Sequence, residues 1–234
     1  MQPMTQTMRA DAAAVPLVAV PAALPSAGAV SRMLRNTYAL LALTLLFSAG
    51  VAAASVAFRL PAPGILVTLA GFFGLLFVVH KLRNGVWALP AVFAMTGFMG
   101  YTLGPALAKT LALPGGAQVV TLALAATGVT FLALSAWVLT TRRDFSFMGG
   151  FLFAGMVIAL VAALGAVFFQ IPTLGLVVSA MVALLSAGLI LHETSRIVHG
   201  GETNYVLATV GLYVSIFNLF TSLLSLFGIG GSDE

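Results

Sequence analysis

Chemically versatile side chains are concentrated in residues 191–205, which read LHETSRIVHGGETNY. This stretch contains two of the three histidines of the chain, two of its six acidic residues and one arginine, and long apolar runs flank it on both sides. Histidine and carboxylate side chains bind metals, and histidine changes its protonation near neutral pH. The first question is therefore whether these residues form a metal site, a proton sensor or an ordinary polar turn.

The spacing of these residues argues against a metal site. If the preceding helix continues to Val198, then His192, Arg196 and His199 share one helix face at i, i+4 and i+7, and Glu193 reaches Arg196 at i+3. Zinc enzymes instead place two histidines four residues apart around a glutamate, so we predict no metal site. A proton sensor stays open, and the alternative is a solvated cytoplasmic turn with ordinary charged side chains.

Helix-ending and helix-starting residues follow in the same stretch. Gly200 or Gly201 is expected to end the sixth helix, because glycine adopts the left-handed conformation found there. Thr203 or Asn204 is expected to cap the helix that follows, because short polar side chains accept hydrogen bonds from free backbone N–H groups.

The composition places these residues in a membrane protein. Of the 234 residues, 61% are hydrophobic and only 7% are charged, whereas a soluble domain has about 25% charged residues. Most of the surface must therefore face the lipid bilayer. Scattered basic residues exclude a nucleic-acid-binding surface, and no nucleophile motif, cysteine or cofactor motif is present. We predict a protein that is not an enzyme and uses no cofactor.

Seven apolar segments are long enough to cross the bilayer as helices, which need about 20 residues. Because backbone groups in lipid must pair internally, we predict an all-α bundle of seven transmembrane helices. The turn LPAPG at 60–64 separates the first two. The predicted segments are 38–58, 62–79, 86–108, 117–139, 145–169, 173–191 and 205–227.

Basic residues predict the orientation of this bundle. With a cytoplasmic N-terminus and an outside C-terminus, the outside connections carry only Arg59 and Lys109. This asymmetry satisfies the positive-inside rule. The inside segments carry Arg9, Arg32, Arg35, Lys81, Arg83, Arg142, Arg143 and Arg196.

The two ends of the chain differ from the bundle, which we assign to residues 31–230. Residues 1–30 are rich in alanine and proline, which predicts a flexible cytoplasmic tail. The alternative is a signal peptide cleaved after the AGA at 27–29. Residues 231–234, GSDE, form a short acidic end.

Two patterns of small and polar residues predict helix contacts. Gly97, Gly100 and Gly104 lie on one face of the third helix, where a neighbouring helix can approach closely, and Pro105 follows them. Four residues form a polar stripe on the last helix, which predicts either interhelical hydrogen bonds or the lining of a polar pathway. They are Ser215, Asn218, Ser222 and Ser225.

Residues 32–228 resemble the Bax inhibitor-1 family of seven-helix membrane proteins. The resemblance is carried by RNTYALLALTLLFSAG, TGFMGYTLGP, TTRRDFSFMGGFL and the segment HETSRIVHGGETNY with the later LYVSIFNLFTSLLSLFG. Details such as HGGETNY are most similar to the bacterial branch described as modulators of the membrane protease FtsH. The resemblance thus implies a multi-pass protein of the bacterial inner membrane.

The resemblance also implies roles for individual residues. In calcium-leak members a pair of carboxylates shares a proton and gates a pore; the first falls here at Glu193 and the second at Ser215, which cannot ionise. A basic partner falls at about Lys81, and an acid seen in some members is missing near Ala70. The lost carboxylate weakens the expected pH gate.

Three functions remain open. The first is a regulatory protein that binds and modulates FtsH, with the N-terminal tail as a segment that an ATP-driven protease can grip. The second is a pH-sensitive calcium or cation leak with a weakened gate. The third is a purely structural membrane protein, for which the residues offer no positive signal.

Overall fold

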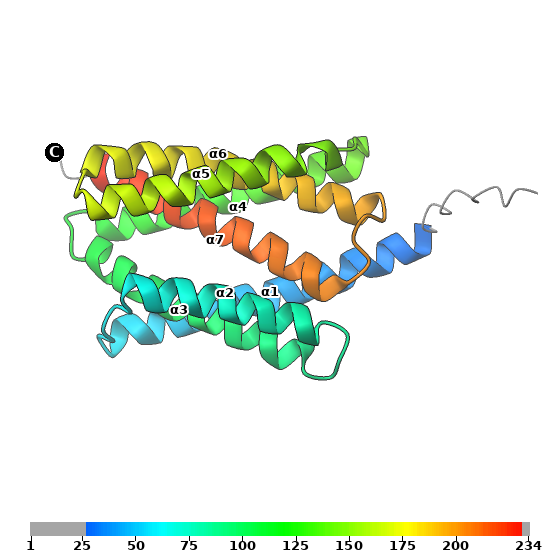
Figure 1. The fold of residues 1–234 in the computed structure, drawn as a ribbon, viewed down its shortest axis with the longest axis horizontal. Coiled ribbons are helices and arrows are strands. Elements are labelled where there is room, and N and C mark those ends of the chain that lie inside the picture. Colours follow the sequence, from blue (N-terminus) through cyan, green and yellow to red (C-terminus); the bar gives the residue numbers. More distant parts are fainter. Residues whose placement is uncertain (1–26, 231–234) are drawn as a thin grey trace, which may run out of the picture.

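The computed structural model describes residues 27–230, and the predicted acidic end and most of the predicted tail lie outside this range. The described chain is mostly helical and has no strands, and seven of its helices are long and apolar enough to cross a membrane (Figure 1). The predicted fold class is therefore confirmed. The elements are α1 (Ala27–Ala57), α2 (Ile65–Leu82), α3 (Ala88–Leu111), α4 (Gly116–Thr141), the short 3₁₀ helix η1 (Ser146–Met148), α5 (Gly149–Phe168), α6 (Pro172–Val198) and α7 (Tyr205–Gly230).

Helix α1 corrects one predicted boundary. It begins at Ala27 instead of residue 38, so residues 27–30 of the predicted tail are helical, and Arg32 and Arg35 lie on the helix. The prediction used apolar length, which detects only the part of a helix that lies in lipid. No proline follows Pro25 in this stretch, so the backbone continues as a helix through the polar residues.

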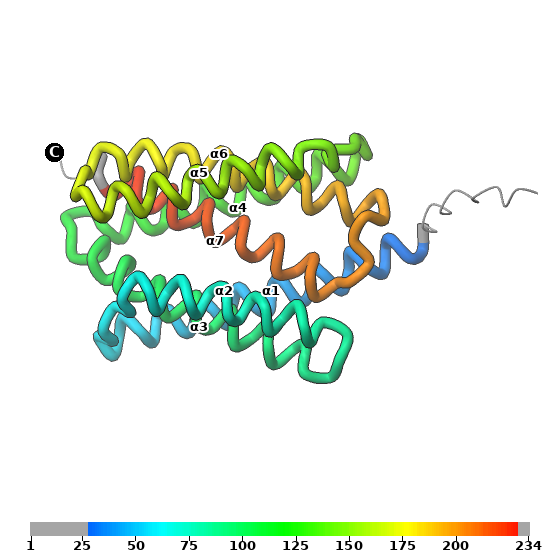
Figure 2. Tube along the Cα trace, viewed as in Figure 1, coloured from blue at the N-terminus to red at the C-terminus, as the bar shows by residue number. Residues whose placement is uncertain are grey.

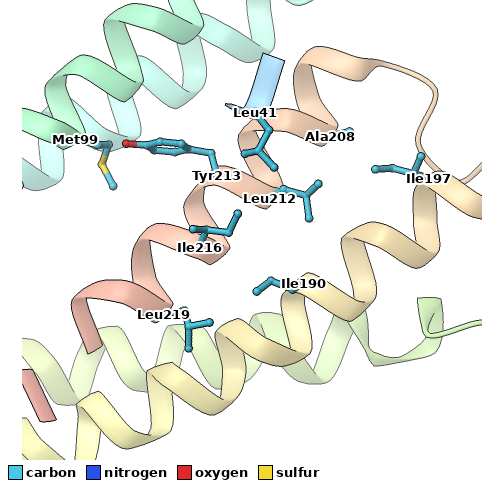
Figure 3. Packing of buried hydrophobic residues seen from close by; sticks show 9 residues of the cluster. All are labelled: Leu41, Met99, Ile190, Ile197, Ala208, Leu212, Tyr213, Ile216 and Leu219. Atoms are coloured by element: carbon cyan, nitrogen blue, oxygen red, sulfur yellow. The ribbon is translucent and has the colours of Figure 1, made fainter. Parts of the chain in front are cut away.

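Helix α7 lies in the middle of the bundle. It runs obliquely between a group formed by α1, α2 and α3 and a group formed by α4, α5 and α6 (Figures 1 and 2). It packs against α1, α3, α4 and α6, whereas α2 packs mainly against α3, and α5 mainly against α6. A buried cluster joins α7 to α1, α3 and α6 (Figure 3). It contains Leu41, Met99, Ile190, Ile197, Ala208, Leu212, Tyr213, Ile216 and Leu219.

The close contact between α1 and α3 is made at glycines. The Cα of Gly100 lies against the backbone oxygen of Ser48, and Gly104 lies against the hydroxyl of Ser55. Gly97 faces the ring of Phe47 in the same way. A side chain at position 100 would meet backbone, so the two helices approach this closely only with glycine there. Helix α3 continues through Pro105 to Leu111.

A buried hydrogen-bond cluster ties α7 to this pair of helices. The hydroxyl of Tyr213 lies 2.6 Å from Ser48 Oγ and donates to the backbone oxygen of Thr96 at 3.3 Å. All three residues are buried. The cluster connects α1, α3 and α7 and satisfies polar groups that would be costly to leave unpaired inside a membrane.

Candidate functional site

The end of α6 is bound to the loop between α4 and α5, which comprises residues 142–145. Nδ1 of His192 lies 3.2 Å from the backbone oxygen of Phe145, and Ser195 Oγ accepts a hydrogen bond from the Phe145 N–H at 2.9 Å. Nε2 of His199 lies 3.0 Å from the backbone oxygen of Arg142. These three residues of α6 stand at i, i+3 and i+7, so one helix face binds the whole loop.

Ser195 was not predicted as a site residue, although it is fully buried at the centre of this contact. The spacing in the sequence alone predicts that Ser195 lies between His192 and His199 on one helix face. Its partner, Phe145, lies 50 residues away along the chain, so only the folded structure brings the two together.

Asp144 organises the same loop. Its Oδ1 accepts a hydrogen bond from the Ser146 N–H at 2.8 Å at the start of η1. Hydrogen bonds from the side chain and then the backbone of Ser146 lower the pKa of Asp144 below its ordinary value, and the charge of His199 contributes to the shift.

Arg196, which the spacing puts on one helix face with the two histidines, binds carboxylates in the described chain instead of this loop. Its Nη1 lies 3.5 Å from Glu193 Oε2, as the i+3 spacing led us to expect, and its Nη2 lies 3.2 Å from Glu202 Oε2. The end of α6 packs against η1 and against α7, so neighbouring positions on the helix bind different elements. The result is an arginine held between two carboxylates.

Glu193 meets Gly211 of α7, a residue that the sequence did not single out. A Cβ atom on Gly211 would lie 2.9 Å from the carboxyl carbon of Glu193. The hydroxyl of Ser215, one turn later, donates to the backbone oxygen of Gly211 at 2.9 Å. Within residues 27–230 no hydrogen bond joins Glu193 to Ser215, and the nearest basic partner of Glu193 is Arg196.

Lys81 stands apart from this cluster. It is exposed on the last turn of α2, and within the described chain it forms no ion pair with Glu193. Within the described chain the ion pair of Glu193 is formed with Arg196, on α6 itself.

The turn between α6 and α7 has the expected ends. Val198 is the last residue of α6, His199 is its C-cap, and Gly200 follows with φ of 74°. Oδ1 of Asn204 accepts hydrogen bonds from the N–H groups of Val206 and Leu207, at 2.9 and 3.2 Å, and so caps α7.

Asn204 also joins the α6–α7 turn to the α2–α3 turn. Its Nδ2 donates to the backbone oxygen of Arg83 at 3.2 Å and to Oδ1 of Asn84 at 2.9 Å. The α4–α5 loop is bound nearby through His199, and the hydroxyl of Thr209 donates to the backbone oxygen of Thr37 near the start of α1. Three connections and the start of α1 therefore meet at one end of the bundle, the end that carries the basic residues of the predicted cytoplasmic side.

The polar stripe of α7 faces its neighbours. Ser215 and Ser222 are buried, Asn218 and Ser225 are half-buried, and Ser179 of α6 donates a hydrogen bond to Ser225 Oγ at 3.3 Å. Among the hydrogen bonds within residues 27–230, the one that joins a stripe side chain to another helix is thus an α6–α7 contact.

An open pocket of about 820 Å³ lies toward the opposite end of the bundle. The start of α4, with Gln118, and the last turns of α7, with Phe227, line it. None of its lining residues belongs to the cluster around Glu193.

The fold and this site define a multi-pass membrane protein whose polar contacts gather at one end of a seven-helix bundle. The sequence profile of the family described as Inhibitor of apoptosis-promoting Bax1 matches residues 30–232. The chain belongs to this family, the Bax inhibitor-1 family.

Bacterial relatives cover nearly the whole bundle. An uncharacterised protein of Pseudomonas aeruginosa is 56% identical over 205 residues, which are 88% of this chain and 92% of the relative. The Modulator of FtsH protease YccA of Escherichia coli K12 is 50% identical over 202 residues, or 86% of this chain and 92% of the relative. The Inner membrane protein YccA of Escherichia coli O6:H1 matches with the same identity and coverage. The chain is accordingly an integral protein of the bacterial inner membrane, and its named relative is a modulator of a protease.

Proposed function

We propose that the protein is a regulatory membrane protein that binds FtsH and modulates its protease activity. The observation that carries this proposal is the 50% identity, over 202 residues, to a protein named as a modulator of that protease. The match covers 86% of this chain, so a surface shared with that relative would be retained over most of the bundle. In this proposal the protein acts by binding, without catalysis.

The contacts of Glu193 support a regulatory role over a calcium leak. Its carboxylate is paired with Arg196 and packed against Gly211, and the hydroxyl of Ser215 is used by a backbone carbonyl of its own helix. A gate based on two carboxylates that share a proton needs a second acid close to the first. At position 215 the chain offers a hydroxyl that bonds elsewhere.

The N-terminal segment is the proposed point of engagement. An ATP-driven protease acts on the side of the membrane that holds ATP, and the positive-inside bias predicts that the N-terminus lies on that cytoplasmic side. Because α1 begins at Ala27, residues 2–26 can be deleted without removing a described helix.

Co-purification with FtsH in mild detergent tests the proposal, using the intact chain and a variant lacking residues 2–26. FtsH should co-purify with the intact chain, and in proteoliposomes the intact chain should change the rate at which FtsH degrades another membrane substrate. Degradation of the chain itself, measured in the same reaction, distinguishes a competing substrate from a bound modulator. If the intact chain neither associates with FtsH nor alters its turnover of the substrate, the proposal is wrong.

A flux assay separates this role from the leak. Purified protein in liposomes is expected to pass no more calcium than empty liposomes between about pH 6 and about pH 8, the range in which histidine titrates. The variants Glu193→Gln and Ser215→Asp are measured beside the wild type. Calcium flux in the wild type that responds to Glu193→Gln would favour the leak instead.

A further inference from the structure

His199 has a hydrogen-bond acceptor at each of its ring nitrogens. Nδ1 lies 2.9 Å from the backbone oxygen of Ser195, and Nε2 lies 3.0 Å from the backbone oxygen of Arg142. A carbonyl oxygen can only accept, and a neutral imidazole carries one N–H group. Both hydrogen bonds therefore form together only when the ring is doubly protonated.

The hydroxyl of Ser195 is surrounded by more acceptors than it can serve. Besides accepting from the Phe145 N–H, its Oγ lies 3.3 Å from Asp144 Oδ1, 3.4 Å from the backbone oxygen of Arg143 and 3.3 Å from His199 Nδ1. A hydroxyl has a single proton to donate. Which of these acceptors receives the hydroxyl proton of Ser195 depends on whether His199 Nδ1 is protonated.

The protonation of His199 Nδ1 and the donor direction of the Ser195 hydroxyl are coupled, because these two atoms lie 3.3 Å apart. When His199 is doubly protonated, Nδ1 cannot accept, so Ser195 donates toward the α4–α5 loop. When Nδ1 has lost its proton, its lone pair accepts a hydrogen bond from the Ser195 hydroxyl. The backbone oxygen of Ser195 then receives no hydrogen bond from Nδ1. The loop then loses the hydrogen bond that Ser195 donates to it.

We propose that His199 and Ser195 form a protonation-dependent clasp that holds the α4–α5 loop against the end of α6. The clasp is complete when His199 carries both ring protons and is weakened when it carries one. This inference does not rest on the proposed function.

The charged and titratable groups around His199 come from the α4–α5 loop, from α6 and from the turn that follows α6. From the loop, Asp144 presents its carboxylate to Ser195, and the side chains of Arg142 and Arg143 are exposed. On α6, His192 binds the oxygen of Phe145. Within residues 27–230, Arg196, paired with Glu193 and Glu202, completes the set.

The clasp controls a strained part of the backbone. Arg142 ends α4 with φ of 50°, a left-handed conformation that is uncommon for a residue with a side chain. Its carbonyl is held by His199 and its N–H by the oxygen of Val138. If His199 loses the proton on Nε2, the carbonyl of Arg142 is released; if it loses the proton on Nδ1, the loop loses the hydrogen bond from Ser195. Either loss would let the loop leave this conformation more readily and would move two exposed arginines.

Limited trypsin digestion tests the clasp, because trypsin cleaves after Arg142 and Arg143. The exposed Arg83 in the α2–α3 turn serves as an internal reference, and the ratio of the two cleavage rates removes the pH dependence of the protease. In the full-length wild type in detergent, we expect this ratio to rise about fivefold from about pH 6 to about pH 8, the change expected for loss of one hydrogen bond to the loop.

Two variants make the result decisive. His199→Gln cannot gain a ring proton, so its cleavage ratio should not change with pH. Ser195→Ala keeps His199 but removes the coupled hydroxyl, so its ratio should be high at both pH values. A wild-type ratio that is flat, or a pH response that persists in His199→Gln, would overturn the proposal.

Nitrogen-15 NMR of histidine in the intact protein gives a second readout that does not need a variant to fold. At about pH 6 both ring nitrogens of His199 should carry protons, and the exposed His80 in the same sample is the comparison. A neutral His199 ring at that pH would also contradict the clasp.

Discussion

The carboxylate of Glu193 occupies the space beside Gly211 that a side chain at position 211 would otherwise fill. A Cβ atom there would lie 2.9 Å from the carboxyl carbon and 3.1 and 3.2 Å from the two carboxylate oxygens. Glu193 is at the same time paired with Arg196. A glycine on α7 thus makes room for the charged end of a residue on α6, and the contact can be tested by adding one methyl group.

Gly211→Ala should displace the carboxylate of Glu193 and weaken its pairing with Arg196. Overpacking of this kind costs about 1–3 kcal/mol in the free energy of unfolding, so the midpoint of thermal unfolding in detergent should fall. Gly74→Ala on α2 is the matched control, because no heavy atom lies within 4 Å of the added Cβ. Alanine is the better helix former by about 1 kcal/mol, so this control should be neutral or more stable. Equal midpoints for the two variants would show that Glu193 is not confined by Gly211.

Gly100→Ala should separate α1 from α3. The added Cβ would meet the backbone oxygen of Ser48, which cannot rotate away as a side chain can. We expect a loss of about 1–3 kcal/mol or more in the free energy of unfolding. Gly50→Ala on α1 has open space around its added Cβ and should retain wild-type stability. Both are measured as unfolding midpoints in the same detergent, and a Gly100→Ala protein as stable as Gly50→Ala would contradict the close contact.

A double-mutant cycle measures the hydrogen bond between Tyr213 and Ser48. Each of Tyr213→Phe and Ser48→Ala removes one partner and should lower the free energy of unfolding by about 1 kcal/mol. The double variant should lose less than the sum, with a coupling energy of about 0.6 kcal/mol, typical of hydrogen bonds between membrane helices. Unfolding by sodium dodecyl sulfate in mixed micelles gives these values. Strictly additive losses would mean that the 2.6 Å contact contributes no coupling.

Asp144 should make stability depend on pH on the acid side. Its pKa is lowered by the hydrogen bonds from Ser146, so the folded protein favours the carboxylate. The resulting stabilisation is present above the ordinary pKa of aspartate and is lost as the pH falls through the lowered value. Asp144→Asn, which stays neutral, should therefore be less stable than the wild type at about pH 6, and the difference should shrink toward about pH 3. Thermal unfolding across this range is the measurement, and a difference that is constant with pH would argue against the shift.

Several parts of the site followed from local sequence. Thr203 or Asn204 was expected to cap α7, and it is the side chain of Asn204 that accepts hydrogen bonds from Val206 and Leu207. The end of α6 at Val198 and the reach of Glu193 to Arg196 also follow from spacing on one helix. Such features depend on residues a few positions apart, where helix geometry alone sets the distances.

Other parts could not be read in this way. Ser195 forms a hydrogen bond with a loop residue 50 positions earlier in the chain, and the need for glycine at position 211 comes from its contact with Glu193 on another helix. The spacing puts Arg196 on one helix face with the histidines, but it does not show which element lies opposite each residue, so the pairing of Arg196 with Glu202 could not be predicted.

Composition and the lengths of the apolar runs by themselves determined that this protein is an all-α bundle of seven membrane-spanning helices, because the bilayer demands long apolar segments whose backbone groups pair internally. Only the tertiary structure decided that Glu193 meets Gly211 in place of Ser215, and that His199 and Ser195 hold the α4–α5 loop. The physical reason is that lipid selects for apolar surface without regard to which helices touch, whereas the partner of each polar side chain depends on how those helices pack.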